Sequence, residues 1–320
     1  MKQRDIGIDV LKFMAVLAIT NSHMDVLYGK YSYLATGGAI GDALFFFVSE
    51  FTLFLGGKTF DNYYKKRINR IYPTVFAWAM LKCILFADTK DFLSVMIFGG
   101  GWFVSCIMIY YVILFMIRRF FLKNLMYIFT ASLLISMVVF PVFQDGEYFN
   151  MYAETYYKWV FFFVFMLQGA AMGWYSQQKS FQIKNIRTEM TKLLGCIVLF
   201  YNLCAFKKSS VWNCCQVLSL FPLLGVTHYF YGCCNNERIK SIYTSTRLGW
   251  CMNVIGGLCL EIYLVQSHLF TDKLNFLFPL NIILIFFAIV FAAYILRCLA
   301  RIWAQTFRDG EYQWKEVWKF

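Results

Sequence analysis

The sequence predicts an all-α integral membrane protein with about ten transmembrane helices and both termini in the cytoplasm. The first observation is composition: of 320 residues, 60% are hydrophobic and only 15% are charged. The second is that the hydrophobic residues form separate runs, several of them near the roughly 20 residues that a membrane-spanning helix needs. The third is that most basic residues lie between these runs. A soluble chain of this length cannot bury so much apolar surface.

The distribution of Lys and Arg orients the predicted spans. The spans are residues 8–27, 39–56, 71–87, 95–117, 125–143, 157–175, 193–206, 211–231, 250–270 and 277–300. The connections on the side of the termini hold 22 of the 30 basic residues, those on the other side hold 6, and Lys12 and Lys82 lie inside spans. The richer side is cytoplasmic by the positive-inside rule. Topology therefore accounts for the net charge of +12, and no nucleic-acid partner is predicted.

The chain has no repeat of 20–50 residues and no low-complexity linker. We therefore expect one membrane domain, residues 1–300, followed by a short cytoplasmic tail, residues 301–320, whose Trp and basic residues are typical of an interfacial segment. The 11 cysteines lack metal-ligand spacing with histidine, so no metal site is predicted. Lys12 interrupts the first apolar run, which predicts a retained signal anchor.

The first span carries Asp9, Lys12 and His23 in an otherwise apolar stretch. On a regular helix the 11 steps from Lys12 to His23 make about three turns, so the two side chains share a face about 16 Å apart. Ionisable groups within a membrane are costly and usually mark a functional site. We therefore expect this face to be functional.

The second span, GGAIGDALFFFVSEF, has glycines that permit close helix packing. Asp42 lies near its outer end, and Glu50 lies within the apolar run. A buried glutamate either pairs with a cation or is protonated. Both an intramembrane ion pair and a catalytic role remain open for Glu50.

A basic cluster precedes the third span, in the segment DNYYKKRINRIYPTVF. It contains Lys65, Lys66, Arg67 and Arg70, just before Pro73. Two arginines three residues apart reach the same side of a helix and bind phosphate or carboxylate bidentately. The alternative is an ordinary positive-inside cluster.

The fourth and ninth spans carry further candidates. Trp102 follows three glycines, which either let a substrate approach the backbone or serve packing. In the ninth span, Glu261 and His268 are seven residues apart and share a face of a regular helix, with Tyr263 and Gln266 as polar neighbours. His268 is near the outer end, where solvation alone is the simpler interpretation.

In these residues the chain resembles the membrane acyltransferase 3 family, integral-membrane enzymes that O-acylate sugars of bacterial surface polysaccharides. The resemblance spans nearly the whole chain. Lys12 and His23 match the family's basic residue, ten residues, then histidine, and Arg67, Arg70 and Pro73 match its Arg-x-x-Arg ahead of Ile-x-Pro. The stretches GDALFFFVSEF, WFVSCIMIYYVILF and LEIYLVQSH resemble three further family motifs. The chain departs from the family at Glu50, where glycine is usual, and at Gln266, where histidine is usual.

The resemblance implies an acyl-coenzyme A donor, most often acetyl-CoA, and an acceptor that is a polysaccharide or its lipid-linked sugar precursor, at the bacterial cytoplasmic (inner) membrane. The expected donor-binding residues are Lys12, Lys66, Arg67 and Arg70, and the expected substrate-binding residues are Asp42, Trp102, Tyr263, Gln266 and His268. His23 is expected to act as general base or transient acyl carrier, oriented by Glu50 or Glu261. Membrane lipids are the other expected partner.

Two other classes compete with an enzyme. A transporter or flippase for a polar solute or a lipid-linked sugar also explains charges inside spans, and it predicts broken helices and repeated halves. A receptor or scaffold gives no reason for Lys12, His23 and the arginine pair together. The sequence leaves open the acceptor sugar, acetyl against succinyl, and covalent against direct transfer.

Overall fold

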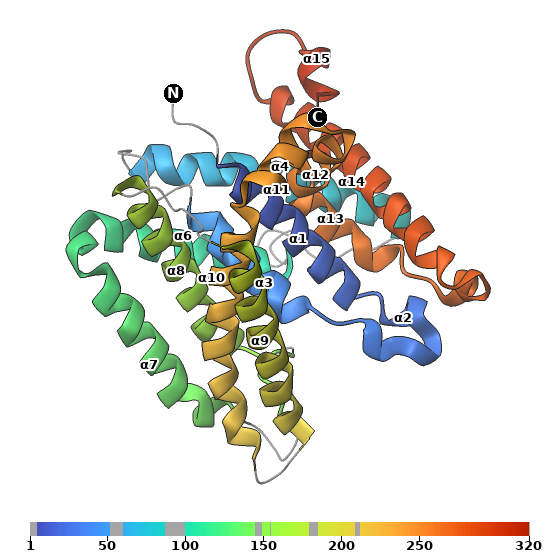
Figure 1. Ribbon diagram of the computed structural model, residues 1–320. Helices are drawn as coiled ribbons and strands as arrows, with labels where there is room; N and C mark the ends of the chain where they lie inside the picture. Colours follow the sequence, from blue (N-terminus) through green and yellow to red (C-terminus); the bar gives the residue numbers. More distant parts are fainter. Residues whose placement is uncertain are drawn as a thin grey trace. The chain divides into compact units, whose positions relative to one another are not determined.

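The computed structural model describes residues 5–51, 60–86, 100–144, 149–153, 155–178, 185–208 and 212–319, and all regular structure in them is helical. The α-helices are α1 (Ile6–Ser22), α2 (Asp25–Tyr28), α3 (Gly38–Phe51), α4 (Phe60–Phe86), α6 (Gly101–Phe120), α7 (Leu125–Phe143), α8 (Lys158–Gln178), α9 (Ile186–Cys204), α10 (Leu220–Cys234), α11 (Glu237–Ser245), α12 (Arg247–Gly257), α13 (Cys259–Val265), α14 (Leu280–Thr306) and α15 (Trp314–Val317) (Figure 1). The 3-10 helices are η1 (Gly29–Leu34), η2 (Leu122–Asn124), η3 (Ala205–Lys208), η4 (Asn213–Ser219), η5 (Gln266–His268) and η6 (Asp272–Leu277).

The helices confirm the membrane-protein class predicted from the sequence. In the described part of the chain, five stretches are long and apolar enough to cross a bilayer: Gly101–Phe120, Leu122–Phe143, Lys158–Ser176, Asn213–Cys234 and Leu280–Thr306. Two bent pairs, Ile6–Ser22 with Asp25–Leu34 and Arg247–Gly257 with Cys259–His268, raise the number to seven if each pair is one span. Parts of the predicted second, third, fourth and eighth spans lie outside the described residues, and the number ten stays a prediction.

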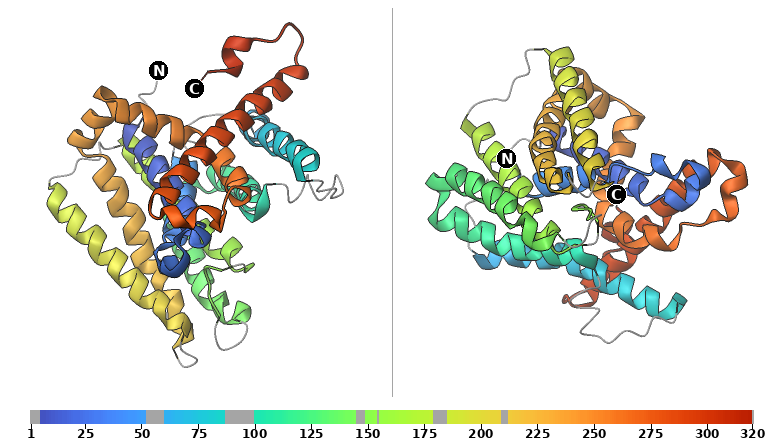
Figure 2. Two further views of the ribbon diagram at one scale, coloured as in Figure 1. Left: turned by 90° about the vertical axis from the view of Figure 1, so that its right-hand side faces the viewer. Right: turned by 90° about the horizontal axis from the view of Figure 1, so that it is seen from below.

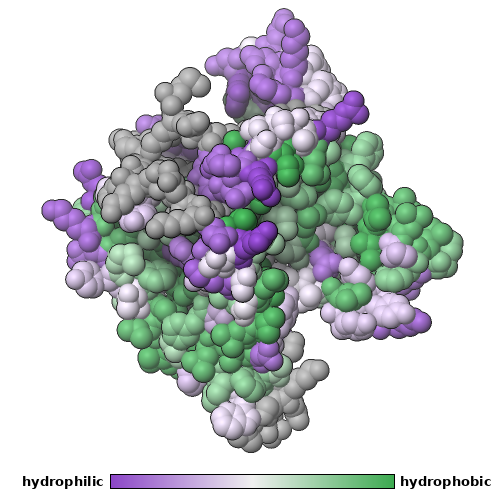
Figure 3. Space-filling view, viewed as in Figure 1, coloured by the Kyte–Doolittle hydropathy of each residue, from purple (hydrophilic) through white to green (hydrophobic). Residues whose placement is uncertain are grey.

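The chain divides into two compact units. The first comprises Met1–Ala15, Ala39–Gly56 and Met116–Asn253, and the second comprises Val16–Gly38, Gly57–Phe115 and Val254–Phe320. Both units draw on distant parts of the sequence. Within the first unit, α9 and α10 pack side by side, as both further views show (Figure 2). Hydrophobic side chains cover α7 and α14, whereas hydrophilic ones gather over α11 and the C-terminal tail (Figure 3). This distribution is that of helices exposed to lipid along their sides.

Glycines bring two helices of the first unit into close contact. Gly169 and Gly173 lie four residues apart on α8, and a Cβ at either would overlap the backbone oxygen of Phe47 or Phe51 on α3. Small residues at this spacing let helix backbones approach in a membrane, where packing and not water drives association. The rings of Phe47 and Phe51 pack at a tilt against Tyr231 of α10, with centroids 5.7 and 5.0 Å away.

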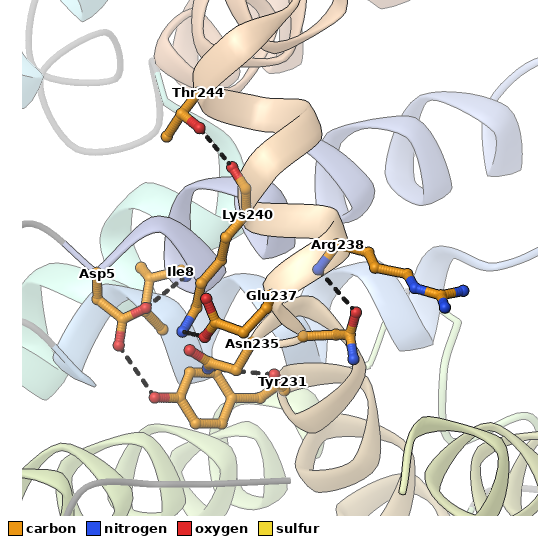
Figure 4. Close-up of polar contacts among 9 residues, drawn as sticks. Asp5, Ile8, Tyr231, Asn235, Glu237, Arg238, Lys240 and Thr244 are labelled. Atoms are coloured by element: carbon orange, nitrogen blue, oxygen red, sulfur yellow. Dashed lines mark hydrogen bonds and ion pairs between the residues drawn. The ribbon is translucent and has the colours of Figure 1, made fainter.

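A polar cluster fixes the start of α1 in the same unit (Figure 4). Asp5 caps the helix by accepting from the backbone N–H of Ile8 at 3.3 Å, and its other oxygen accepts from the hydroxyl of Tyr231 at 3.0 Å. Gly7 leaves room for the amide of Asn235, which a Cβ would meet at 2.7 Å. Nearby, Lys240 pairs with Glu237 at 3.2 Å on α11. The contacts of Asp5 and Gly7 tie the start of α1 to the C-terminal end of α10.

In the second unit, α4, α13 and α14 pack against one another. The C-terminal tail turns back onto α14, because Arg301 donates to the carbonyls of Val317 (3.0 Å) and Lys319, and the hydroxyl of Tyr294 donates to the carbonyl of Trp318 at 2.9 Å. Backbone carbonyls without a hydrogen-bond partner in a regular helix need such side-chain donors.

Three helix boundaries differ from the sequence prediction. The first helix ends at Ser22, within the predicted span 8–27, and the ninth predicted span is broken at Leu258. The segment 61–70, predicted as a connection, is helical: α4 begins at Phe60 and continues through Pro73. Polar side chains that bind backbone groups, described next, account for the first two differences, and periodicity alone does not reveal them.

Candidate active site

His23 lies on a turn between two helices and is exposed to solvent. Its backbone N–H donates to the carbonyl of Thr20 at 3.2 Å, and the chain bends by 65° between α1 and the α2–η1 segment. Lys12 and His23 therefore do not share a face of one regular helix, contrary to the sequence prediction, because α1 ends at Ser22, one residue before the histidine. An exposed imidazole at a helix break is accessible to a substrate.

Side-chain amides shape the loop that His23 begins. Asn21 donates to the carbonyls of Leu34 and Thr36, both at 2.9 Å, and accepts from the hydroxyl of Tyr28 at 2.6 Å. At the end of α1, the backbone N–H groups of His23 and Met24 donate to the carbonyls of Thr20 and Asn21, at 3.2 and 3.1 Å, in place of regular helical hydrogen bonds. Asn21 was not among the predicted site residues, although an asparagine two positions before His23 in an apolar run is a visible signal.

Arg67 is buried on α4, with a relative exposure of 8%. Its guanidinium lies over the rings of Tyr63 and Tyr111, 5.7 and 4.8 Å from their centroids. Its Nε is buried without a hydrogen-bond partner in the described part of the chain. A buried guanidinium with a vacant donor is suited to an anionic ligand.

The other basic residues of this cluster are exposed. Lys66 and Arg70 lie on α4 on either side of Arg67 in sequence, and both face solvent. Near them, burial raises the pKa of Tyr64, with Tyr72 contributing in the same direction. The Tyr64 phenol therefore stays neutral and donates to the carbonyl of Met108 at 3.5 Å. The predicted side-by-side pair of Arg67 and Arg70 thus consists of one buried and one exposed guanidinium.

Glu261 belongs to a buried ion pair. Arg297 of α14 donates to both of its carboxylate oxygens, from Nε at 3.1 Å and from the terminal nitrogen at 2.8 Å. Thr74 of α4 adds a hydrogen bond at 3.5 Å. The same guanidinium donates to the carbonyl of Gly257, the last residue of α12. Arg297 therefore bridges the break between α12 and α13, where the chain bends by 61°.

Arg297 is one of the 22 basic residues that the predicted topology places on the cytoplasmic side. Its position deep in the run IILIFFAIVFAAYILRCLARIW was the signal that it has a specific partner.

Gln266 and His268 lie on η5, past the end of α13. They and Glu261 are therefore not on one regular helix, contrary to the predicted shared face. Gln266 is 3% exposed, and its Oε1 has no hydrogen-bond partner among the residues described. The exposed ring of His268 packs against Trp78 and Phe86 of α4, with centroids 5.1 and 4.9 Å away. Sequence reasoning missed these two aromatic neighbours.

Trp102 and Tyr263 are joined through Phe103, whose ring centroid is 5.8 Å from each. Gly101 adopts a φ of 68°, and a Cβ there would lie 2.7 Å from the Tyr263 hydroxyl. The glycine is thus required both by backbone conformation and by the close approach of Tyr263. Packing explains the part of the glycine run that the structure describes.

The remaining candidates belong to the first unit. Lys12 lies 3.8 Å from Asp9 on α1, Glu50 is 1% exposed on α3, and Asp42 is half-buried on the same helix. The second unit contains His23, Arg67, Glu261, Gln266 and His268. Orientation of His23 by Glu50 stays a prediction.

A protein-family comparison identifies the class. The model of an acyltransferase domain, the acyltransferase 3 family, matches residues 5–298. The chain belongs to this family of membrane acyltransferases. Searches of curated proteins and of solved structures found no match.

Proposed function

We propose that the protein transfers an acetyl group from acetyl-CoA to a hydroxyl of a cell-surface polysaccharide or its lipid-linked precursor, at the bacterial cytoplasmic membrane. The observation that carries the proposal is the family match, which covers residues 5–298 of 320. The proposal includes a single membrane domain, residues 1–300, ten spans, and cytoplasmic termini with the tail 301–320.

The donor is proposed to bind at the α4 basic cluster. Coenzyme A carries several phosphate charges, and Arg67 offers a buried donor to one of them, with Lys66, Arg70 and Lys12 as further cations. The acceptor is proposed to bind near Trp102, Tyr263, Gln266 and His268, with Asp42 contributing. The Oε1 of Gln266 has no hydrogen-bond partner among the described residues, which supports this, since a sugar hydroxyl donates well to such an oxygen.

In the proposed reaction, His23 is the general base that removes the proton of the acceptor hydroxyl. As the hydroxyl oxygen attacks the thioester carbonyl, His23 takes its proton; the carbon–sulfur bond breaks, and the departing thiolate receives a proton to become the coenzyme A thiol. In the alternative course, His23 first carries the acetyl group. Glu50 remains a candidate to orient the imidazole. Glu261 is proposed to act by holding the α12–α13 break through Arg297, because both of its oxygens are engaged.

A transporter or flippase is the second candidate, and one observation favours it. Two pairs of helices are bent by more than 60° at short breaks, the kind of interruption that transporters use for polar sites. Family membership weighs more, because it covers nearly the whole chain.

The test is to express the protein with its host polysaccharide and measure ester-linked acetyl on the purified sugar. We expect wild type to acetylate the sugar and His23→Ala to lose this activity, by about 100-fold or more. His228→Gln on α10 is the matched control and is expected to retain it. Acetylation that survives His23→Ala contradicts the mechanism, and a wild type that moves a solute without acetylating sugar contradicts the class.

A further inference from the structure

We propose that Asn21 is a positioning residue for His23. Its side-chain amide joins the two ends of the loop, residues 23–36, that begins with the histidine. The inference rests on the proposed catalytic role of His23. It assigns a task to a residue that touches neither substrate nor donor.

The hydrogen bonds of Asn21 join the two ends of one excursion of the chain. After α1 ends at Ser22, residues 23–36 leave the helix and return to the start of α3 at Gly38. The Nδ2 of Asn21 donates to the carbonyls of Leu34 and Thr36, both at 2.9 Å, at the far end of the excursion. One side chain therefore holds residue 21 beside residues 34 and 36. Compact loops with closed ends of this kind are frequently functional.

The other atoms of Asn21 are also engaged. Its Oδ1 accepts from the Tyr28 hydroxyl at 2.6 Å, which reaches in from the middle of the loop. Its backbone carbonyl accepts from the N–H of Met24 at 3.1 Å, so the two residues between them, Ser22 and His23, form a tight turn. The backbone of Asn21 thus fixes the turn that bears the imidazole, and its side chain fixes the loop behind it.

The rest of the loop is held independently of Asn21. Buried Asn281 donates to the carbonyl of Leu27 at 2.9 Å and to Asn275 at 3.0 Å, and Asn275 donates to the carbonyl of Val26 at 2.9 Å. The Tyr31 ring stacks on Phe278, with centroids 5.5 Å apart. Loss of the Asn21 contacts therefore leaves the loop packed on η6 and α14. It releases chiefly the two ends of the loop, one of which bears His23.

A general base works only within hydrogen-bond reach of the proton that it removes, and a displacement near 1 Å costs on the order of 100-fold in rate. The geometry thus predicts an effect of Asn21 on kcat. The KM for acetyl-CoA is not expected to change, because His23 is not among the residues proposed to bind the donor.

The informative variant is Asn21→Asp. It keeps the size of the side chain and the acceptor for Tyr28, but it replaces the NH2 that binds two carbonyls with an oxygen that repels them. Tyr28→Phe removes the 2.6 Å bond and leaves both carbonyl contacts. The matched control is Asn202→Asp on α9, because Asn202 also donates to a backbone carbonyl, that of Val198 at 2.7 Å.

The experiment measures kcat and the KM for acetyl-CoA with a fixed acceptor polysaccharide. We expect kcat to fall about 10- to 100-fold in Asn21→Asp, less in Tyr28→Phe and not at all in Asn202→Asp, with KM unchanged. Asn21→Asp is then combined with His23→Ala. If Asn21 acts through His23, it costs nothing further in that background.

Two results overturn the inference. One is an unchanged kcat in Asn21→Asp; the other is an equal fold-loss with and without His23, which indicates a purely structural role. If the His23→Ala background is too slow to measure, kcat per folded enzyme in Asn21→Asp decides: a loss that a smaller amount of folded enzyme explains in full contradicts positioning. A wild type without acetylation contradicts the proposed function itself, so the two failures are distinguishable.

Discussion

Two buried charges of the second unit are satisfied in different ways. Glu261 accepts hydrogen bonds from Arg297 at both oxygens. The guanidinium of Arg67 instead lies over tyrosine rings, and its Nε has no hydrogen-bond partner within the part of the chain that the structure describes. The Glu261 oxygens that bind Arg297 are less available to bind a ligand. A cation over aromatic rings keeps its donors for an anion. The sequence identified both residues, but only the contacts separate an anchor from a binding group.

Replacement of Arg67 is expected to weaken donor binding. Arg67→Gln removes a charge-assisted hydrogen bond, worth about 1.5–3 kcal/mol, and so raises the dissociation constant of coenzyme A by about 10- to 100-fold. Arg67→Lys is expected to fall between, because an ammonium cannot form the planar fork. The measurement is titration calorimetry in detergent, with Arg238→Gln on exposed α11 as the control. Unchanged affinity in Arg67→Gln removes this residue from donor recognition.

At the scale of elements, breaks and close contacts matter more than helix length. The bend between α12 and α13 is bridged by Arg297, and the approach of α3 to α8 depends on two glycines. The bend exposes a helix-end carbonyl, which Arg297 satisfies. The close approach brings backbone atoms together, and a side chain at either glycine would prevent it.

Removal of Arg297 is expected to destabilise the protein strongly. Arg297→Gln leaves Glu261, whose side chain is 5% exposed, as an unpaired buried charge, at a cost of about 3–5 kcal/mol. The double variant with Glu261→Gln is expected to regain a large part of this. Lys319→Gln, which breaks an exposed pair with Glu316, serves as the control and should change stability by less than about 1 kcal/mol. Thermal unfolding in one detergent measures all three; equal losses in the single and double variants would falsify the ion-pair account.

The two glycines of α8 offer a prediction about helix packing. Gly169→Ala and Gly173→Ala each place a methyl group on a backbone oxygen of α3, which costs about 1–3 kcal/mol of strain. Gly195→Ala on α9 meets nothing within 4 Å and should be neutral or stabilising by about 0.5–1 kcal/mol, since alanine is the better helix former. Unfolding midpoints that do not distinguish α8 from α9 variants contradict this packing.

At the scale of the whole molecule, the chain forms two units that each combine distant segments. His23, Arg67, Glu261 and Gln266 fall in one unit, although more than 240 residues separate the first from the last. The proposed acetyl transfer also needs a topology, since coenzyme A is cytoplasmic and a surface polysaccharide is not. The charge asymmetry of the connections supplies the proposed orientation.

The location of the termini tests that topology. An even number of spans, such as ten, leaves both termini on one side, whereas an odd number places them on opposite sides. We expect epitope tags at residues 1 and 320 both to resist protease in intact spheroplasts and both to be cleaved in inverted vesicles. A tag in the loop 28–38 should show the reverse pattern. Opposite behaviour of the two terminal tags rules out ten spans with cytoplasmic ends.

The sequence by itself determined the class of the protein. Apolar runs of spanning length admit only helices in a membrane, because every backbone group must be hydrogen-bonded within the segment. The motif residues Lys12, His23, Arg67, Arg70 and Pro73 indicated the acyltransferase family, and the family comparison confirmed it. These features depend on local composition and spacing, which the chain carries at every position.

Only the tertiary structure decided where helices break and which charges are paired. Asn21 closing on Leu34 and Thr36, and Arg297 reaching both Gly257 and Glu261, join residues 13 to 40 positions apart. Periodicity assumes a regular helix, so it predicted shared faces across Ser22 and Val265 that the structure does not have. A side chain that binds a distant backbone carbonyl ends a helix for reasons that lie outside the local sequence.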